Sequence, residues 1–206
     1  EGNWRTSFNP RASTHRNDDY CEGTAWQWTW FVPHDVDSLV ELMGGRDAFI
    51  GKLDSLFVAD SSLEGESVSV DISGLIGQYA HGNEPSHHIA HLYNYVGQPY
   101  KTQALVDSVL HTLYFNEPNG LSGNEDCGQM SAWYVLNAMG FYQVCPGKPV
   151  YSIGRPLFDE AAIRLQNGNT FTIIAHNNSR DNKYVRKIIL NGEELAAPFF
   201  NHQDIV

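Results

Sequence analysis

Apolar residues recur at helical spacing along the first two thirds of the chain. Each such segment gathers its apolar side chains on one face, which is the pattern of an α-helix packed against a core. Gly97-Gln-Pro99 joins two of these segments directly, so we expect those two helices to lie antiparallel. The helices predicted in this way span residues 36–43, 47–57, 86–96, 99–114 and 128–139.

The pattern changes after residue 141. Residues 170–175 and 183–190 are rich in β-branched and aromatic side chains, as strands are, and Asn191-Gly192 is a strong signal for a hairpin turn. This antiparallel segment is too small for a complete sandwich, so we expect it to pair with strands outside this chain. The sequence therefore predicts a mainly α protein in which 1–145, entered by a polar loop over 1–19, form part of a toroid of helical hairpins, and 146–206 form a C-terminal antiparallel β segment.

Three tryptophans stand at the alternate positions 26, 28 and 30. Alternation favours a strand, but Trp26 and Trp30 also lie one helical turn apart, so both elements remain open. The flat indole of Trp26 suits either core packing or stacking on a sugar. Glu22 comes just before this apolar block, and burial against it would raise the pKa of the carboxyl group, as a general acid requires. A helix-capping role for Glu22 is the alternative.

Charge and composition narrow the classes of function. A formal net charge of −11 over 206 residues makes nucleic acid and anionic membranes poor partners, and suits cations or neutral polar ligands such as sugars. No apolar run approaches the roughly 20 residues of a membrane span. The three cysteines match no zinc-binding pattern.

Residues 120–133 hold two adjacent carboxylates, Glu125 and Asp126, in a loop punctuated by glycines before a helix. Glycine permits unusual backbone conformations and close approach of a ligand, and catalytic groups concentrate in loops on rigid scaffolds. Catalysis by Asp126 is one interpretation. The other is that Asp126 is the N-cap of the following helix.

Residues 74–88 are dense in polar groups around a predicted helix start at Pro85. Gln78, Asn83 and Glu84 supply the oxygen ligands that calcium prefers, and the adjacent imidazoles His87 and His88 favour softer metals or hydrogen bonds to a ligand. A capped helix start with buried histidines is the alternative interpretation.

Three stretches together, Tyr20 to Asp35, Gly77 to His88 and Gly123 to Trp133, closely resemble glycoside hydrolase family 92. The resemblance runs over nearly all of 17–206. It implies a calcium-dependent, inverting exo-α-mannosidase built on an (α/α)6 toroid of helical hairpins. Members of the family are several times longer, so the chain resembles a C-terminal portion, and the missing N-terminal part of the same enzyme is expected to contribute to activity.

The resemblance also implies roles for individual residues. Glu22 falls at the general acid and Asp126 at the general base, with Glu125 as the base or its helper. An inverting glycosidase holds two such carboxyl groups about 6.5–9.5 Å apart, which leaves room for the attacking water. By the resemblance, Trp26, His87, His88 and Asn124 would bind the mannose. Gln78, Asn83 and Glu84 would bind the calcium ion.

The expected substrates are mannose-containing glycans, and we expect a secreted or periplasmic enzyme. Two other functions remain open. One is a non-catalytic carbohydrate-binding protein, although a pure binding site has no need of a paired acid and base. The other is a glycosidase of another specificity on a similar helical toroid.

Overall fold

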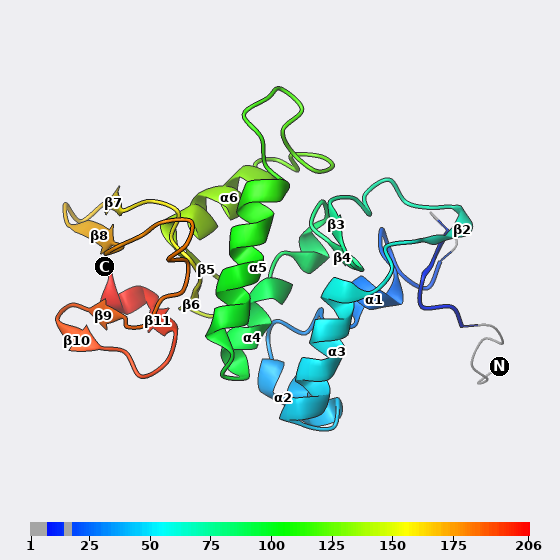
Figure 1. The fold of residues 1–206 in the computed structure, drawn as a ribbon, viewed down its shortest axis with the longest axis horizontal. Helices are drawn as coiled ribbons and strands as arrows, with labels where there is room; N and C mark the ends of the chain where they lie inside the picture. The colour runs from blue at the N-terminus through cyan, green and yellow to red at the C-terminus, as the bar shows by residue number, and fades with distance from the viewer. Residues whose placement is uncertain (1–7, 15–17) are drawn as a thin grey trace.

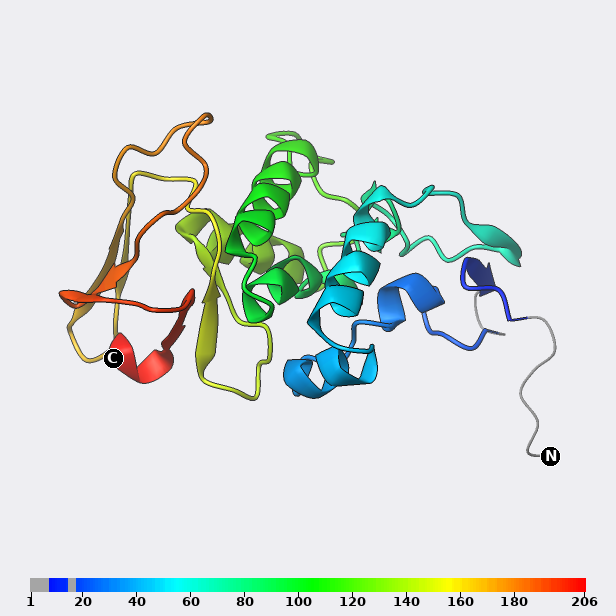
Figure 2. The same ribbon diagram turned by 60° about the horizontal axis from the view of Figure 1, so that its bottom comes forward.

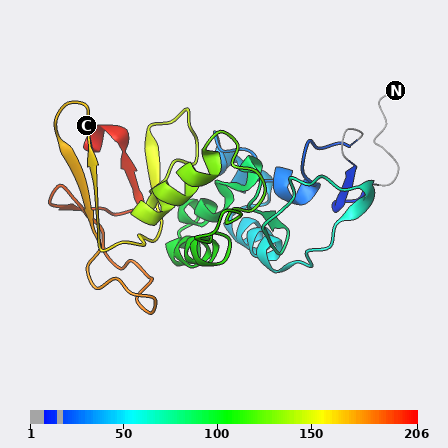
Figure 3. The ribbon, with the colours of Figure 1, turned by 90° about the horizontal axis from the view of Figure 1, so that it is seen from above.

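The computed structural model describes residues 8–14 and 18–206, so most of the predicted entering loop, 1–7 and 15–17, lies outside the described residues. The molecule is elongated, with helices in the middle and strands at both ends (Figures 1 and 2). The same order is seen from above (Figure 3). The helices are α1 Ala25–Trp28, α2 Val36–Leu42, α3 Arg46–Val58, α4 Leu92–Tyr95, α5 Pro99–Thr112 and α6 Gln129–Met139, with the 3-10 turns η1 Glu84–Ser86, η2 Ile89–His91 and η3 His202–Asp204.

Four of the five predicted helices are confirmed, and their ends follow local chemistry. Asp35 caps α2 by accepting a hydrogen bond from the amide of Ser38 at 3.1 Å. Pro99 occupies the first turn of α5, where its missing N–H costs nothing. Gly140 ends α6 with a φ of 99°, a left-handed conformation that favours glycine.

The predicted helix 86–96 is wrong as a single element. The segment consists of η1, η2 and the four-residue α4. All side chains from 86 to 94 are buried, so packing on every side sets the backbone and no amphipathic face exists to favour a regular helix.

The tryptophan segment forms a helical turn, which excludes the strand interpretation. Thr24 and Gln27 make a capping box around α1: the Thr24 hydroxyl accepts from the Trp26 amide at 3.2 Å, and Gln27 Oε1 accepts from the Thr24 amide at 2.6 Å. Trp30, beyond the turn, is fully buried in the core.

Within the described residues the strands form five small sheets. At one end β1 (Ala12–Thr14) pairs in parallel with β2 (Glu64–Ser67). At the other end β6 lies between β5 and β11 in an antiparallel sheet. The remaining sheets are the hairpins β3–β4, β7–β8 and β9–β10. Their bounds are β3 Leu75–Ile76, β4 Tyr79–Ala80, β5 Phe141–Tyr142, β6 Val150–Ile153, β7 Glu160–Arg164, β8 Thr170–Ile174, β9 Ile189–Leu190, β10 Glu193–Glu194 and β11 Phe199–Asn201.

The strand at 170–175 and the hairpin turn at Asn191-Gly192 are confirmed. The strand predicted over 183–190 is reduced to Ile189–Leu190. Its first part binds α5 instead of another strand: the Val185 amide donates to Gln103 Oε1 at 3.1 Å, and Lys183 lies 3.8 Å from Asp107. Side-chain contacts with a helix therefore replace the ladder that its β-branched residues favour.

One apolar core runs through the helical body, built from α2, α3, α5, α6 and the segment 79–96. Its largest fully buried side chains are Trp30, Trp133, Tyr79, Tyr93 and Phe49. In the part of the chain that the structure describes, no helix is long and apolar enough to cross a membrane. This core holds in place the loops that connect the helices, where the candidate site lies.

Candidate active site

The three stretches singled out in the sequence meet at one side of the helical body. The Asn83 side chain donates from Nδ2 to the backbone carbonyl of Glu22 at 2.8 Å. Gly82 and Gly123 pack backbone against backbone, since a Cβ added at Gly123 would lie 3.0 Å from the Gly82 carbonyl oxygen. The loops around Glu22, Asn83 and Asp126 are thus joined by direct contacts.

Glu22 lies in a left-handed turn, with a φ of 51° and an exposed side chain. Thr24 supplies the N-cap of α1, so the capping interpretation of Glu22 is wrong. The expected burial is wrong as well. Gly23 packs against the Trp28 indole, whose Nε1 donates to the Cys21 carbonyl at 2.9 Å, and this holds the turn with its carboxylate facing outwards.

The neighbouring carboxylates Glu125 and Asp126 have different surroundings. Glu125 accepts from the backbone amide and from the hydroxyl of Ser131, both at 3.0 Å, and so satisfies an amide in the first turn of α6. Asp126 has a φ of 49° and an exposed side chain, and among the described residues its carboxylate has no hydrogen-bond or ion-pair partner. The N-cap of α6 is Gly128, so Asp126 does not cap the helix. Of these two neighbouring carboxylates, Asp126 is therefore the one without a partner among the described residues.

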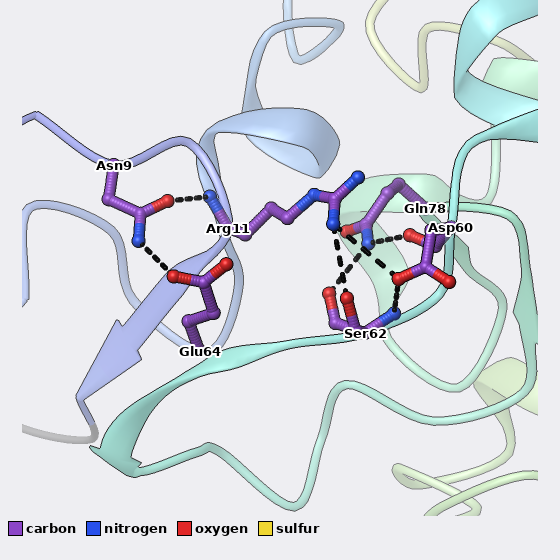
Figure 4. Close-up of polar contacts among 6 residues, drawn as sticks. All are labelled: Asn9, Arg11, Asp60, Ser62, Glu64 and Gln78. Carbon is purple, nitrogen blue, oxygen red and sulfur yellow. Dashed lines mark hydrogen bonds and ion pairs between the residues drawn. The ribbon is translucent and has the colours of Figure 1, made fainter.

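Of the three calcium candidates, Asn83 and Glu84 are adjacent, while Gln78 is held through its amide nitrogen and its Oε1 is buried without a hydrogen-bond partner among the described residues. Gln78 Nε2 donates to the carbonyls of Asp60 at 2.6 Å and Ser62 at 3.0 Å, beside the Arg11 guanidinium (Figure 4). The Arg11 guanidinium already supplies a positive charge there, 3.5 Å from the Asp60 carboxylate. No hydrogen bond joins Gln78 to Asn83 or Glu84 in the described part of the chain.

Asn83 and Glu84 offer oxygen atoms near Glu22. Asn83 Oδ1 accepts from the Glu84 amide at 3.1 Å, and the Glu84 side chain is exposed. No group of three or more His, Cys, Asp or Glu side chains that could hold a metal occurs within the described ranges. The donors present are an amide and a carboxylate oxygen, which suit calcium and not softer metals.

His87 and His88 are both buried and neutral. His87 Nε2 donates to the His81 carbonyl at 3.0 Å, and Nδ1 lies 3.1 Å from Gln129 Nε2. His88 Nε2 donates to the Trp30 carbonyl at 2.8 Å. Burial lowers the pKa of each imidazole to about 4. Both ring nitrogens of His87 are therefore used within the protein, and a sugar contact of either histidine stays a prediction.

Trp26 is half-buried, with Lys52 Nζ 5.3 Å from the centre of its ring, and its own Nε1 is buried without a partner. Asn124 is exposed in the loop next to Glu125. A cavity of about 200 Å3 lies elsewhere, and none of the candidate residues lines it. We therefore take the meeting point of the three loops, and not this cavity, as the candidate site, because the candidate acid and base carboxylates lie in the loops and none of them lines the cavity.

Sequence reasoning missed three side chains behind the site: His81, Tyr114 and Gln129. His81 Nε2 lies 2.7 Å from the Tyr114 hydroxyl, and Gln129 Nε2 contacts both His87 and Tyr142. Single aromatic, imidazole and amide residues at these spacings form no recognisable sequence pattern, although Gln129 stands directly after the glycine that precedes α6.

Comparison with known proteins places the whole chain in one family. The family model "Glycosyl hydrolase family 92 catalytic domain" matches residues 1–206. A solved α-mannosidase of family GH92 from Bacteroides thetaiotaomicron, in complex with mannoimidazole, superposes with a TM-score of 0.91 at 40% identity, over 99% of this chain and 27% of that one.

Two further relatives agree. A family GH92 inverting mannosidase from Bacteroides thetaiotaomicron is 42% identical with a TM-score of 0.82, over 99% of this chain and 28% of that chain. A protein of Arthroderma benhamiae described as an uncharacterized secreted glycosidase is 29% identical over 193 residues, 92% of this chain and 23% of that protein. The chain thus spans about a quarter of the length of these relatives.

Proposed function

Because the chain belongs to glycosyl hydrolase family 92, we propose that it forms part of the catalytic domain of an inverting exo-α-mannosidase that removes terminal α-linked mannose from glycans. The observation that carries this proposal is the meeting of the Glu22 loop, Asn83 and the Asp126 loop at one side of the helical body. The two solved relatives support the substrate class, since both are described as mannosidases.

The proposed mechanism gives each carboxyl group one step. Glu22 protonates the glycosidic oxygen as the bond from that oxygen to C1 breaks, and Asp126 removes a proton from the water whose oxygen attacks C1 from the opposite face. The products are mannose of inverted configuration and the free alcohol. Glu125 is assigned a supporting role, because its carboxylate already binds Ser131.

Calcium is proposed as the cofactor, held by Asn83 and Glu84. Gln78 would contribute its Oε1, which is buried without a hydrogen-bond partner among the described residues, while its amide nitrogen binds the 60–62 segment. When bound, calcium would supply a template and Lewis acid for the sugar oxygens. Asn83 would also tie that site to the acid, since its Nδ2 holds the backbone of Glu22.

We further propose that the helices form part of an (α/α)6 toroid which the rest of a longer, secreted or periplasmic enzyme completes. The similarity of the fold to the solved mannosidases supports the toroid, and the Arthroderma relative, described as a secreted glycosidase, supports secretion. The predicted boundary between the helical part (1–145) and the β segment (146–206) falls between β5 and β6, which pair with each other in one sheet.

The decisive experiment follows hydrolysis of an α-mannoside by proton NMR, using the full-length protein that contains this chain. We expect β-mannose to appear first, and Glu22→Gln to reduce kcat about 10²- to 10⁴-fold, most for poor leaving groups. Removal of calcium with EDTA should abolish turnover.

Three other results would each contradict part of the proposal. Initial release of α-mannose would exclude inversion. Cleavage of other glycosides in place of mannosides would indicate another specificity, and binding of mannosides without turnover would indicate a carbohydrate-binding protein. Full activity after stringent removal of metal would exclude the calcium role.

A further inference from the structure

A chain of buried and partly buried hydrogen bonds connects β4 and η1 with the start of α6. His81 is fully buried, and its ring lies between two phenols: Nδ1 is 2.8 Å from the Tyr79 hydroxyl, and Nε2 is 2.7 Å from the Tyr114 hydroxyl. Tyr114 in turn lies 3.1 Å from the backbone carbonyl of Met130, in the first turn of α6.

The acceptor at the end of this chain sets the direction of every bond in it. The Met130 carbonyl can only accept, so Tyr114 donates its proton there and its oxygen accepts from His81 Nε2–H. The neutral His81 ring must then accept at Nδ1 from the Tyr79 hydroxyl. Each donor meets an acceptor, as a buried polar network requires.

A second branch reaches the same turn of α6. His87 Nε2–H donates to the His81 carbonyl, which leaves His87 Nδ1 to accept from Gln129 Nε2 at 3.1 Å. Trp133 Nε1 donates to the His87 carbonyl at 2.9 Å. Side chains of α6 on two successive turns are thus bound to the segment 81–87.

The loop that these bonds reach is strained. Asp126, Cys127 and Gly128 follow one another with φ values of 49°, 56° and 97°. Two successive non-glycine residues in the left-handed region are costly, and such strain persists only where the surroundings hold it. The amides of Gln129 and Met130 close the loop onto the carbonyls of Asp126 and Glu125, at 3.2 and 3.3 Å.

Tyr114 and Gln129 therefore act on the two residues that close the strained loop. We propose that Tyr114 and Gln129 are positioning residues, which hold the Asp126 carboxylate in place through Met130, His81 and His87. The assignment of Asp126 as the base rests on the proposed function, whereas the mechanical coupling of Tyr114 to the loop does not.

The test compares Tyr114→Phe with Tyr134→Phe in the full-length protein. Both variants lose one phenol hydroxyl, and the Tyr134 ring packs on that of Tyr114 at 4.9 Å, but only Tyr114 bonds to His81 and Met130. Hydrogen exchange is read at the amides of 125–131, with the amides of α3 as an internal reference. We expect exchange in 125–131 to be about tenfold faster in Tyr114→Phe and unchanged in Tyr134→Phe.

Kinetics supply the second readout. In Tyr114→Phe, kcat should fall about tenfold with KM unchanged, and by the same factor for aryl mannosides with good and poor leaving groups, because a displaced base affects both alike. Gln129→Met, which removes the donor to His87 but keeps the bulk, should show the same pair of effects.

Faster exchange spread evenly over 125–131 and α3 would overturn the proposal, since it would show only a loss of global stability. Unchanged exchange in 125–131 would overturn it too, as would a rise in KM at constant kcat. If the parent protein released no mannose, the proposed function would fail. A local increase in exchange would still support the coupling of Tyr114 to the loop.

Discussion

Glu125 and Asp126 are adjacent in the chain, yet their side chains have separate tasks because the backbone turns into the left-handed region between them. Glu125 binds the amide and hydroxyl of Ser131, while Asp126 faces outwards. We expect Asp126→Asn to reduce kcat at least 10²-fold, as loss of a general base does. Glu125→Gln should reduce kcat less than tenfold and lower stability by about 1 kcal/mol, as loss of a cap does.

Steady-state kinetics and urea denaturation of the two variants test this division. Equal losses of kcat in both would show that Glu125 shares the chemistry. A Glu125→Gln protein of unchanged stability would show that its bonds to Ser131 contribute nothing.

The sequence could identify the segments that carry the chemistry, but not the environment of each side chain. Glu22 precedes an apolar block, yet it is exposed because the left-handed turn directs it away from Trp28. His87 and His88 look like ligand-binding groups in the sequence, but both rings donate to backbone carbonyls. The bond of His88 to Trp30 joins residues 58 apart, and the shorter-range bonds of Trp28 to Cys21 and of His87 to His81 depend on how these side chains pack in the folded chain, which hydrophobic patterns do not encode.

At the scale of elements, the capping box of α1 connects a helical turn to the candidate site. Thr24 is fully buried and bonds through its hydroxyl to the Trp26 amide and to Gln27 Oε1. Gln27 Nε2 donates to the Gln78 carbonyl at 2.5 Å, which ties α1 to the β3–β4 hairpin. A four-residue helix has little stability of its own, so these bonds maintain it.

Thr24→Val should therefore lower the free energy of unfolding by about 1–2 kcal/mol, because it removes the cap and leaves buried polar groups without a partner. Thr112→Val is the matched control: its hydroxyl bonds to the Ser108 carbonyl on the exposed side of α5. It should change stability by less than about 0.5 kcal/mol. Similar losses in the two variants, measured by urea denaturation, would show that the capping box has no special role.

Elements were predictable where one face of the helix is buried and the other is exposed. Helices α2, α3, α5 and α6 meet this condition, and Asp35, Pro99 and Gly140 mark the start of α2, the start of α5 and the end of α6. The segment 86–96 does not meet it, because its side chains are buried on nearly all sides and contacts with neighbouring elements set its backbone. Residues 183–188 have strand-like composition but bind α5 through side chains, so composition alone assigned them wrongly.

At the scale of the whole molecule, His91 links the helical body to the C-terminal sheet. It is fully buried, with Nε2 2.8 Å from Asn137 Oδ1 and Nδ1 3.0 Å from the hydroxyl of Ser152 on β6. Asn137 Nδ2 donates to the Trp133 carbonyl, so its Oδ1 accepts from His91 Nε2–H. His91 Nδ1 then accepts from Ser152, whose oxygen is also bound by Asn94 Nδ2. A proton on Nδ1 would force the Ser152 oxygen to accept from both His91 and Asn94, and the Ser152 hydroxyl would lose His91 as its acceptor.

Lowering the pH should therefore reduce the free energy of unfolding through protonation of His91 in the unfolded chain. Burial lowers the pKa of this imidazole from 6.5 to about 4. Above pH 6.5 the ring is neutral both folded and unfolded, so it adds no pH dependence. Between pH 6.5 and 4 only the unfolded chain takes up the proton, and stability falls as the pH falls, by about 3 kcal/mol in all.

Urea denaturation between pH 6.5 and 4 measures this contribution as a slope. His91→Gln should reduce the slope of unfolding free energy against pH by about 1.4 kcal/mol per pH unit, the value for one proton, even if the variant is less stable throughout. An equal slope in the His91 variant and the parent would show that the ring accepts its proton in the folded state, and that the junction between helices and sheet does not depend on a neutral imidazole.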